Sequence, residues 1–208
     1  MIAGNDYVAK QNVISVKEND TLEDALSKLK ESGFRCIPVL DESETKFVGN
    51  IYKIHILEFE KEGSLRNPVK ELVENKDGFV NEDQAFFKVF FSIKRLPYLA
   101  VVNGVGDFLG ILTHANVINV LEDAWGVNNG SYSLTIGTVE FSGALAKMLK
   151  LINRYCNVQS VISLNNNSLY ARRVCIVLPE GVELNTVERI KKDLYKNNFQ
   201  VTDVEKLN

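Results

Sequence analysis

The side chains that could do chemistry are few and widely spaced in this chain of 208 residues. They include two histidines, His55 and His114, and three cysteines, Cys36, Cys156 and Cys175. An odd number of cysteines with no CxxC pair predicts neither a disulfide framework nor a zinc site. A nucleophile–histidine–acid triad would have to combine one of these histidines with residues distant in sequence. The motifs GxxxxGK[ST], HExxH and GxSxG are all missing, so the sequence argues against an enzyme and against a metal centre.

Binding chemistry suits the remaining polar residues better. Thr113 precedes a predicted helix and is a preferred N-cap residue. The free N–H groups at such a helix start favour a phosphate. His55 could titrate near neutrality. Gly104 and Gly106 lack the third glycine of a dinucleotide-binding loop, so they indicate a hairpin turn.

Composition limits the choice of partners. The chain is 45% hydrophobic and 25% charged, which is typical of a globular protein. Its net charge of -3 argues against binding DNA or RNA, although it allows a pocket for one small anion. The N-terminus does not resemble a signal peptide, and the longest apolar runs are too short to cross a membrane. We therefore expect a cytoplasmic protein with no membrane partner.

The elements that must position these residues form an internal repeat in the first half. Val39 and Val101 are 62 residues apart, Gly49 and Gly110 are 61 apart, and Asp20 and Asp83 are 63 apart. Each repeat is predicted to contain a short strand, a helix, two strands joined by a polar turn, and a second helix. The closing helices are expected to carry Ile54, Ile56 and Leu57 in the first repeat, and Val117, Ile118 and Leu121 in the second.

The first helix of the first repeat is predicted over residues 21–32. Leu22, Ala25, Leu26 and Leu29 have the spacing of one helix face. Asp20 is the expected N-cap, with Glu23 three residues later, and Gly33 is the expected C-terminal stop.

This order, with Ile37-Pro38-Val39-Leu40-Asp41 and Gly110-Ile111-Leu112-Thr113, resembles the CBS domain, and two copies resemble a CBS pair, or Bateman module. The resemblance covers residues 9–123. It implies one repeat over residues 1–62 and a second over 63–125, with the linker in 60–68. The repeats are expected to pack face to face and to leave clefts between them.

The second half has a different pattern, after a break at residues 126–131. Strands are predicted from Tyr132, over 158–164, over 169–178 with Val174, Ile176 and Leu178 on one face, and over 200–205. Helices are predicted over 142–155, with Leu145, Met148, Leu149 and Ile152 inward, and over 185–197. Residues 165–168 form the expected turn. This βαββαβ order predicts a ferredoxin-like fold over 131–208.

The stretch 139–146 resembles the first loop of ACT domains, with Gly143 and Leu145 kept and Ser142 in place of the usual proline. The fold class is therefore α/β (α+β): tandem CBS repeats followed by a βαββαβ ferredoxin-like ACT domain. The serine predicts that the ACT-like domain binds no amino acid.

By resemblance to CBS pairs, each cleft holds a nucleotide: one repeat takes the base, and the helix start of the other takes the sugar and phosphate. The preferred cleft would use Asn12, Val13, Ile14, Arg35, Cys36 and Ile37 for the base, and Thr113, His114, Asn116, Lys94 and Arg95 for the sugar and phosphate. The second cleft would use Phe79, Val80, Tyr98 and Leu99 with Tyr52 and His55.

Both clefts depart from the family pattern, in which an aspartate grips the ribose diol. That position is Asn116 in one helix and His55 in the other, and the usual threonine is Tyr52 in the second cleft. A cyclic dinucleotide, whose riboses keep only the 2′-hydroxyl, needs less from this position. The favoured ligand is therefore cyclic di-AMP, as in the similar stand-alone CBS proteins of Gram-positive bacteria. The combination of domains is also similar to the acetoin-utilisation-type CBS–ACT family. AMP or ATP, and a ligand-free interaction scaffold, remain alternatives.

The expected assembly is a homodimer, because CBS pairs and ACT domains commonly associate. Residues 200–205 would offer an exposed strand edge for pairing. A ligand-dependent change in packing would be passed to the ACT-like domain or to a protein partner. No cofactor is predicted.

Overall fold

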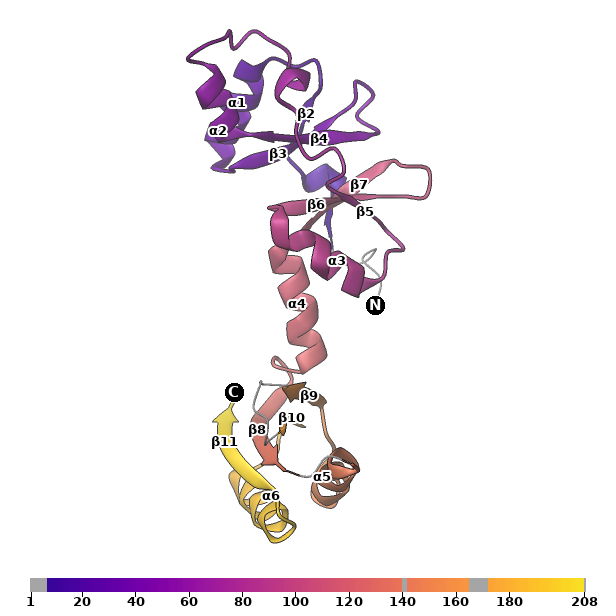
Figure 1. Cartoon of the computed structure of the whole chain (residues 1–208), viewed down its shortest axis with the longest axis vertical. Coiled ribbons are helices and arrows are strands. Elements are labelled where there is room, and N and C mark those ends of the chain that lie inside the picture. Colours follow the sequence, from indigo (N-terminus) through magenta and orange to yellow (C-terminus); the bar gives the residue numbers. More distant parts are fainter. Residues whose placement is uncertain (1–6, 140–141, 165–171, 208) are drawn as a thin grey trace. The chain divides into compact units, whose positions relative to one another are not determined.

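The computed structural model describes residues 7–139, 142–164 and 172–207. The chain divides into two compact units, Met1–Ile118 and Asn119–Asn208, and the division falls within helix α4 (His114–Trp125). Among the described residues, the first unit contains two sheets and the second contains one (Figure 1).

The first repeat is a three-stranded sheet with two helices. The central strand β3 (Cys36–Leu40) is parallel to β2 (Val16–Lys17) and antiparallel to β4 (Phe47–Tyr52). All of β3 is buried, as expected for an unbroken apolar run covered on both faces. Helices α1 (Leu22–Ser32) and α2 (Lys53–Phe59) supply Leu26, Leu29 and Ile56 to the core of this repeat. Of the apolar residues predicted on this closing helix, Ile56 is buried and Leu57 packs against the core, whereas Ile54 is 54% exposed.

Helix α1 is capped one residue later than predicted. Its N-cap is Thr21, whose hydroxyl accepts a hydrogen bond from Asp24 N, while the Asp24 carboxylate accepts one from Thr21 N. Asp20 is used differently: its carboxylate accepts from Lys17 N and closes the turn after β2. The predicted Asp20–Glu23 cap is therefore wrong. Gly33 ends the helix in the left-handed conformation at φ 73°, as predicted.

The second repeat has the same order of elements. Its strands are β5 (Phe79–Asn81), β6 (Tyr98–Val102) and β7 (Phe108–Thr113), its helices are α3 (Phe86–Ser92) and α4, and short 3-10 turns cover Val69–Leu72 and Ile93–Arg95. β5 is parallel to β6, and β7 is antiparallel to it. Phe86, Val89 and Val117 are buried, whereas Ile118, predicted to face inward, is 52% exposed.

Each repeat lends a short segment to the sheet of the other. β1 (Val8–Ala9), which precedes the 3-10 turn Lys10–Asn12, pairs with β7 of the second repeat. In the same way, Glu74 pairs with Asn50 on β4 of the first repeat. A Cβ atom added to Gly110 would lie 2.0 Å from Val8 O, and one added to Gly49 would lie 2.7 Å from Glu74 O. Each repeat thus needs a glycine at this position, Gly49 or Gly110, because the exchanged backbone of the other repeat comes too close for a side chain.

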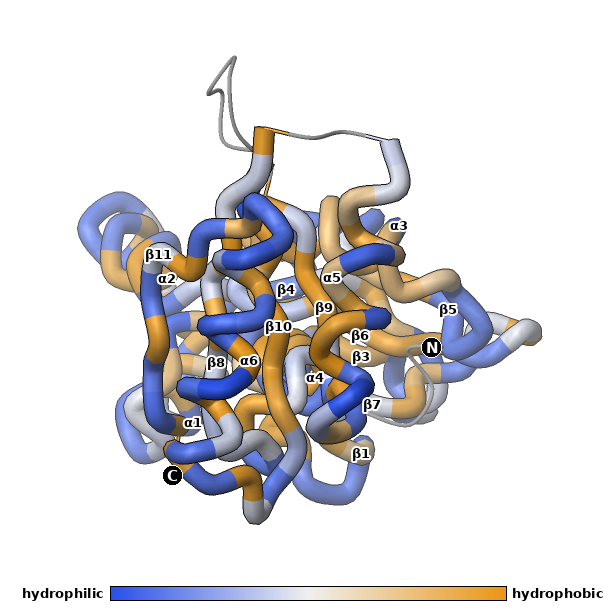
Figure 2. The backbone as a smooth tube through the Cα atoms, turned by 90° about the horizontal axis from the view of Figure 1, so that it is seen from below, coloured by the Kyte–Doolittle hydropathy of each residue, from blue (hydrophilic) through white to orange (hydrophobic). Residues whose placement is uncertain are grey.

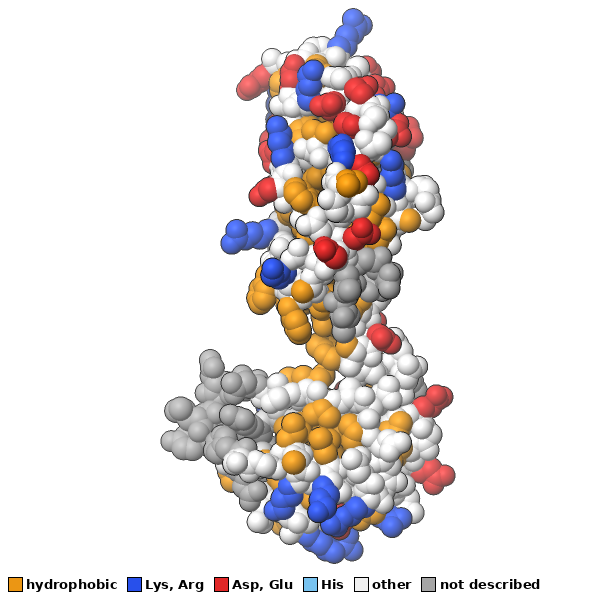
Figure 3. Space-filling view, turned by 90° about the vertical axis from the view of Figure 1, so that its right-hand side faces the viewer, with side chains coloured by type: hydrophobic (Ala, Val, Ile, Leu, Met, Phe, Trp, Pro, Cys, Tyr) orange, Lys and Arg blue, Asp and Glu red, His pale blue; other side chains and the backbone are white. Residues whose placement is uncertain are grey.

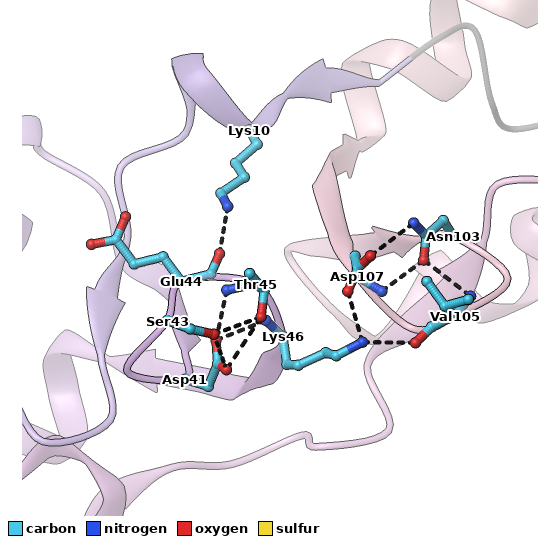
Figure 4. Close-up of polar contacts among 9 residues, drawn as sticks. All are labelled: Lys10, Asp41, Ser43, Glu44, Thr45, Lys46, Asn103, Val105 and Asp107. Carbon is cyan, nitrogen blue, oxygen red and sulfur yellow. Dashed lines mark hydrogen bonds and ion pairs between the residues drawn. The ribbon is translucent and has the colours of Figure 1, made fainter.

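The hairpins of the two repeats are joined by polar contacts (Figure 4). Lys46 Nζ donates to Asp107 Oδ1 and to Val105 O, each at 2.7 Å. The Lys10 ammonium donates to Glu44 O. Phe47 and Phe108 stack behind this contact, with ring centroids 6.3 Å apart. The repeats are therefore held together by a lysine bridge over an aromatic pair.

Asp41 organises the first of these hairpins, and this predicts a dependence of stability on pH. Its carboxylate accepts from Lys46 N, Ser43 Oγ and Thr45 N, and these bonds lower its pKa from 3.8 to about 2. A lowered pKa means that the stabilisation is present above the ordinary value and is lost as pH falls toward the folded value. Asp41→Asn should be less stable than wild type at neutral pH, and the gap should narrow between about pH 4 and pH 2.

Denaturant unfolding at steps of pH would measure this gap. Glu58→Gln is the control, because Glu58 is exposed and its side chain makes no hydrogen bond to the described part of the chain. A gap of constant size across the acid range would show that the charge of Asp41 does not matter.

The second unit is a four-stranded antiparallel sheet with two helices. Its elements are β8 (Gly130–Thr138), α5 (Ala144–Ile152), β9 (Ser160–Leu164), β10 (Arg172–Pro179), α6 (Leu184–Lys196) and β11 (Gln200–Lys206). The strand order β11-β8-β10-β9 is that of a ferredoxin-like sandwich, as predicted. Residues 200–206 do form an edge of this sheet. Figure 2 shows β10 as hydrophobic along most of its length.

The core of this unit confirms one predicted face and corrects another. Val174, Ile176 and Leu178 are buried in it, as predicted. Helix α5 begins at Ala144, after Gly143 at φ 75°, so its inner face is Ala144, Met148, Leu151 and Ile152. Leu145 was predicted to be inward, but it is 43% exposed. The predicted turn 165–168, the start of the predicted strand at 169–171, and residues 140–141 of the ACT-like stretch lie outside the described residues.

Candidate functional site

The first unit has one cleft between its two repeats and a second cleft lined by residues of the second repeat. The first cleft, of about 360 Å³, is formed where β3, β6 and β7 end or begin. It is lined by Ile14, Gly33, Phe34, Arg35, Cys36, Ile37, Pro38, Pro97, Tyr98, Ile111 and Thr113. Arg35 is the one charged residue among these, so the cleft combines apolar walls with a single cation.

Thr113 and Asn116 are tied together at the mouth of this cleft by the cap of α4. Thr113 N and Thr113 Oγ1 both donate to Asn116 Oδ1, at 3.0 and 2.6 Å, and Asn116 N donates back to Thr113 Oγ1. The amide oxygen of Asn116 is therefore occupied, and its Nδ2 is the atom left to meet a ligand. Such a side chain donates hydrogen bonds, whereas an aspartate would accept them. His114 Nδ1 lies 3.1 Å from Pro97 O, which holds the ring at the rim.

An uncharged polar cluster backs the first cleft. Tyr98 Oη donates to Asn50 Oδ1 at 2.6 Å and lies 3.7 Å from Cys36 Sγ. Burial raises the pKa of the Cys36 thiol to about 11 and the pKa of Tyr98 well above its usual value. Both groups are neutral at physiological pH, so this wall offers hydrogen bonding without charge. The high pKa also makes Cys36 a poor nucleophile.

The second cleft, of about 380 Å³, is more polar. It is lined by Asn75, Asp77, Phe79, Ser92, Arg95, Leu96 and Leu99. Next to it, Tyr52 Oη donates to Asn75 Oδ1 at 2.6 Å, and the Tyr52 and His55 rings lie 5.3 Å apart. His55 Nδ1 lies 3.2 Å from Glu74 Oε1. Tyr52 and His55, at the start of α2, are thus in contact with other side chains of the protein.

The structure gathers part of the predicted set at each cleft. Ile14, Arg35, Cys36, Ile37 and Thr113 line the first cleft, and Phe79 and Leu99 line the second. Arg95, assigned from sequence to the first cleft, lines the second, and Tyr98, assigned to the second, lines the first.

Eight predicted residues line neither cleft: Asn12, Val13, Tyr52, His55, Val80, Lys94, His114 and Asn116. Val13 lines a neighbouring groove with Lys17 and Lys28. Asn12 is exposed at the end of a 3-10 turn, and Val80, in the middle of β5, is buried. The Lys94 ammonium lies over the Phe90 and Phe91 rings, at 5.8 and 5.7 Å from their centroids.

Sequence reasoning missed Phe34, Pro38, Pro97 and Ile111. Pro97 stands 62 residues after Arg35, so the repeat spacing already pointed to it. The sequence also offered a signal for Phe34, which is a large aromatic residue between a helix-ending glycine and a strand. In the structure its side chain is 52% exposed at the cleft.

Three further findings concern the rest of the molecule. Figure 3 shows one face with hydrophobic, basic and acidic side chains interspersed. Within the described residues, no three His, Cys, Asp or Glu side chains gather as a metal site would require. No described helix is long and apolar enough to cross a membrane.

Comparison with known proteins agrees with the repeat architecture. The CBS domain family matches residues 5–62, and no curated protein matches the chain. A crystal structure of CbpB in complex with c-di-AMP is 20% identical, with a TM-score of 0.54 over 59% of this chain and 85% of that one. A CBS domain-containing protein from Bacillus anthracis is 26% identical, with a TM-score of 0.53 over 59% of this chain and 93% of that one.

A protein with a CBS domain pair and an ACT domain, from Thermotoga maritima, is also similar. It is 21% identical, with a TM-score of 0.52 over 60% of this chain and 98% of that one. These likenesses concern the fold. Residues 5–62 thus match a CBS domain, and the chain has the fold of tandem CBS repeats followed by a ferredoxin-like domain of the ACT type.

Proposed function

We propose that the first unit is a regulatory nucleotide-binding module, and that its ligand is cyclic di-AMP, bound in the first cleft. The observation that carries this proposal is the cleft itself. Its apolar walls suit a flat base, and Arg35 is its one charged lining residue. A cleft of this size is in the range of small-molecule sites. Similar folds bind c-di-AMP in CbpB, AMP in CBSX2 and ATP in a CNNM/CorC transporter domain.

Asn116 favours the cyclic dinucleotide over AMP or ATP. With its oxygen held by Thr113, Asn116 offers a donor to phosphate or ether oxygens but no acceptor for a ribose diol. AMP and ATP present a free diol, whose hydroxyls need an acceptor. Cyclic di-AMP has esterified 3′-oxygens and places phosphate oxygens beside the same position.

Calorimetric titration with cyclic di-AMP, AMP and ATP in parallel tests the proposal. We expect micromolar or tighter binding of cyclic di-AMP and at least tenfold weaker binding of the other two, a difference of about 1.4 kcal/mol. A preference for AMP or ATP would make the protein an energy sensor. No binding of any of the three nucleotides would favour the interaction scaffold.

The variant Asn116→Asp sharpens this test. Its carboxylate can keep the helix cap with one oxygen and present the other as an acceptor. We expect AMP to bind more tightly to this variant, because its ribose diol gains an acceptor. Cyclic di-AMP should bind more weakly, because the new carboxylate would face its phosphate. Equal shifts for both ligands would argue against the role given to Asn116.

We further propose that the protein works as a cytoplasmic homodimer without a cofactor, that it is not an enzyme, and that ligand binding changes the packing of the two repeats. The lysine bridge of Lys46 to Asp107 crosses between their hairpins and would respond to such a change. Light scattering with and without nucleotide would report the assembly state. A concentration-independent monomer would contradict the dimer.

A further inference from the structure

The two clefts of the first unit are related by the repeat but differ at the corner where the sugar and phosphate would lie. Tyr52 and His55 precede Thr113 and Asn116 by 61 residues and occupy the same places at the starts of α2 and α4. In the first cleft these places hold a small hydroxyl and an amide. In the second they hold two aromatic rings.

Both rings lie against the exchanged segment of the chain. Tyr52 donates to Asn75, which lines the second cleft, and His55 lies beside Glu74, the residue before it. Tyr52 and His55 also contact each other. The four side chains therefore form a connected group at this corner, held at the point where Glu74 pairs with Asn50.

Among the described residues, the strand exchanged at the first cleft, β1, does not do the same. By the pairing of the sheets, Val8 and Ala9 lie on β7 where Glu74 lies on β4. Neither Val8 nor Ala9 has a side chain that can form a hydrogen bond. Within the described part of the chain, the Thr113–Asn116 pair is bonded in its own helix cap and keeps a donor for a ligand.

The charged residues at the two clefts also differ in a way that favours phosphate in the first cleft. Asp77 and Arg95 both line the second cleft and Glu74 lies next to it, so a phosphate there would meet one cation and two carboxylates. Among the described residues, the lining of the first cleft contains Arg35 and no acid. The first cleft is therefore more favourable to an anionic ligand than the second.

We infer that Tyr52 and His55 close the second cleft to nucleotide phosphate, so that each chain binds nucleotide in the first cleft alone. This inference rests on the proposed function and adds the number of sites and the residues that set it. Tyr52 and His55 are specificity-determining residues: they disfavour an anionic ligand by placing two aromatic rings beside the cleft, against Asn75 and Glu74.

The inference is tested by exchanging the residues at the two corners and measuring by calorimetry how many nucleotides each chain binds. Wild type should bind no more than one cyclic di-AMP per chain. The double variant Tyr52→Thr/His55→Asn gives the second corner the residues of the first and should add a second equivalent. The reciprocal variant Thr113→Tyr/Asn116→His should lower affinity at least tenfold. Thermal melting of each variant checks that it is folded.

The outcomes separate this inference from the proposed function. Two equivalents on wild type, or a folded Tyr52→Thr/His55→Asn variant with unchanged stoichiometry, would overturn the inference and leave a nucleotide-binding module. If that variant does not fold, full affinity in the reciprocal variant would overturn it. Wild type that binds none of the three nucleotides would contradict the proposed function, while a site gained by the double variant would still support the inference.

Discussion

Replacing Gly110 with alanine is expected to lower the free energy of unfolding of the first unit by about 2–4 kcal/mol. An added Cβ would lie 2.0 Å from Val8 O and 2.7 Å from the Tyr7 ring. Backbone oxygen cannot yield as the end of a flexible side chain can, so β1 would have to leave the edge of β7. That movement would expose the neighbouring core of Leu40, Ala100 and Phe108.

Gly104→Ala is the matched control, because it lies in the same hairpin of the second repeat and its added Cβ would meet nothing within 4 Å. We expect its unfolding free energy to stay within about 0.5 kcal/mol of wild type. Chemical denaturation followed by circular dichroism would compare the two. Equal stability of both variants would show that the exchange of β1 does not stabilise the unit.

Replacing Arg35 with alanine is expected to weaken cyclic di-AMP binding by about 10- to 100-fold, since a hydrogen bond to a charged group contributes about 1.5–3 kcal/mol. Arg35 is the one cation among the described residues lining the first cleft, so no neighbour in that lining can replace it. Arg35→Lys should recover part of the loss, because it keeps the charge but not the planar pair of donors.

Arg66→Ala serves as the control, since it removes an equal charge from an exposed position in the linker between the repeats. Its affinity should stay within about twofold of wild type. Arg95→Ala distinguishes the clefts. A larger loss with Arg95→Ala than with Arg35→Ala would place the phosphate in the second cleft and contradict the assignment.

Much of the architecture followed from local patterns. The 61- to 63-residue spacing predicted two equivalent repeats, and the alternation of apolar residues predicted the βαββαβ order of the second half. The predictions that were wrong concern positions where two neighbouring residues could fill the same structural role. Asp20 and Thr21 are both good caps, and only the turn after β2 decides that Asp20 bonds Lys17 N. Helix faces shifted by one residue for the same reason, as at Leu145 in α5.

The clefts depended on information that a linear pattern does not hold. The sequence repeat predicted two clefts, and the resemblance to CBS pairs predicted which strand and helix starts would line them. Tertiary structure decided that Tyr98 belongs to the first cleft and Arg95 to the second. It also decided that Tyr52 bonds to Asn75 and that His55 lies beside Glu74. The reason is physical: a repeat spacing fixes what is equivalent, but contacts between exchanged segments depend on distances across the sheets, which only the folded chain sets.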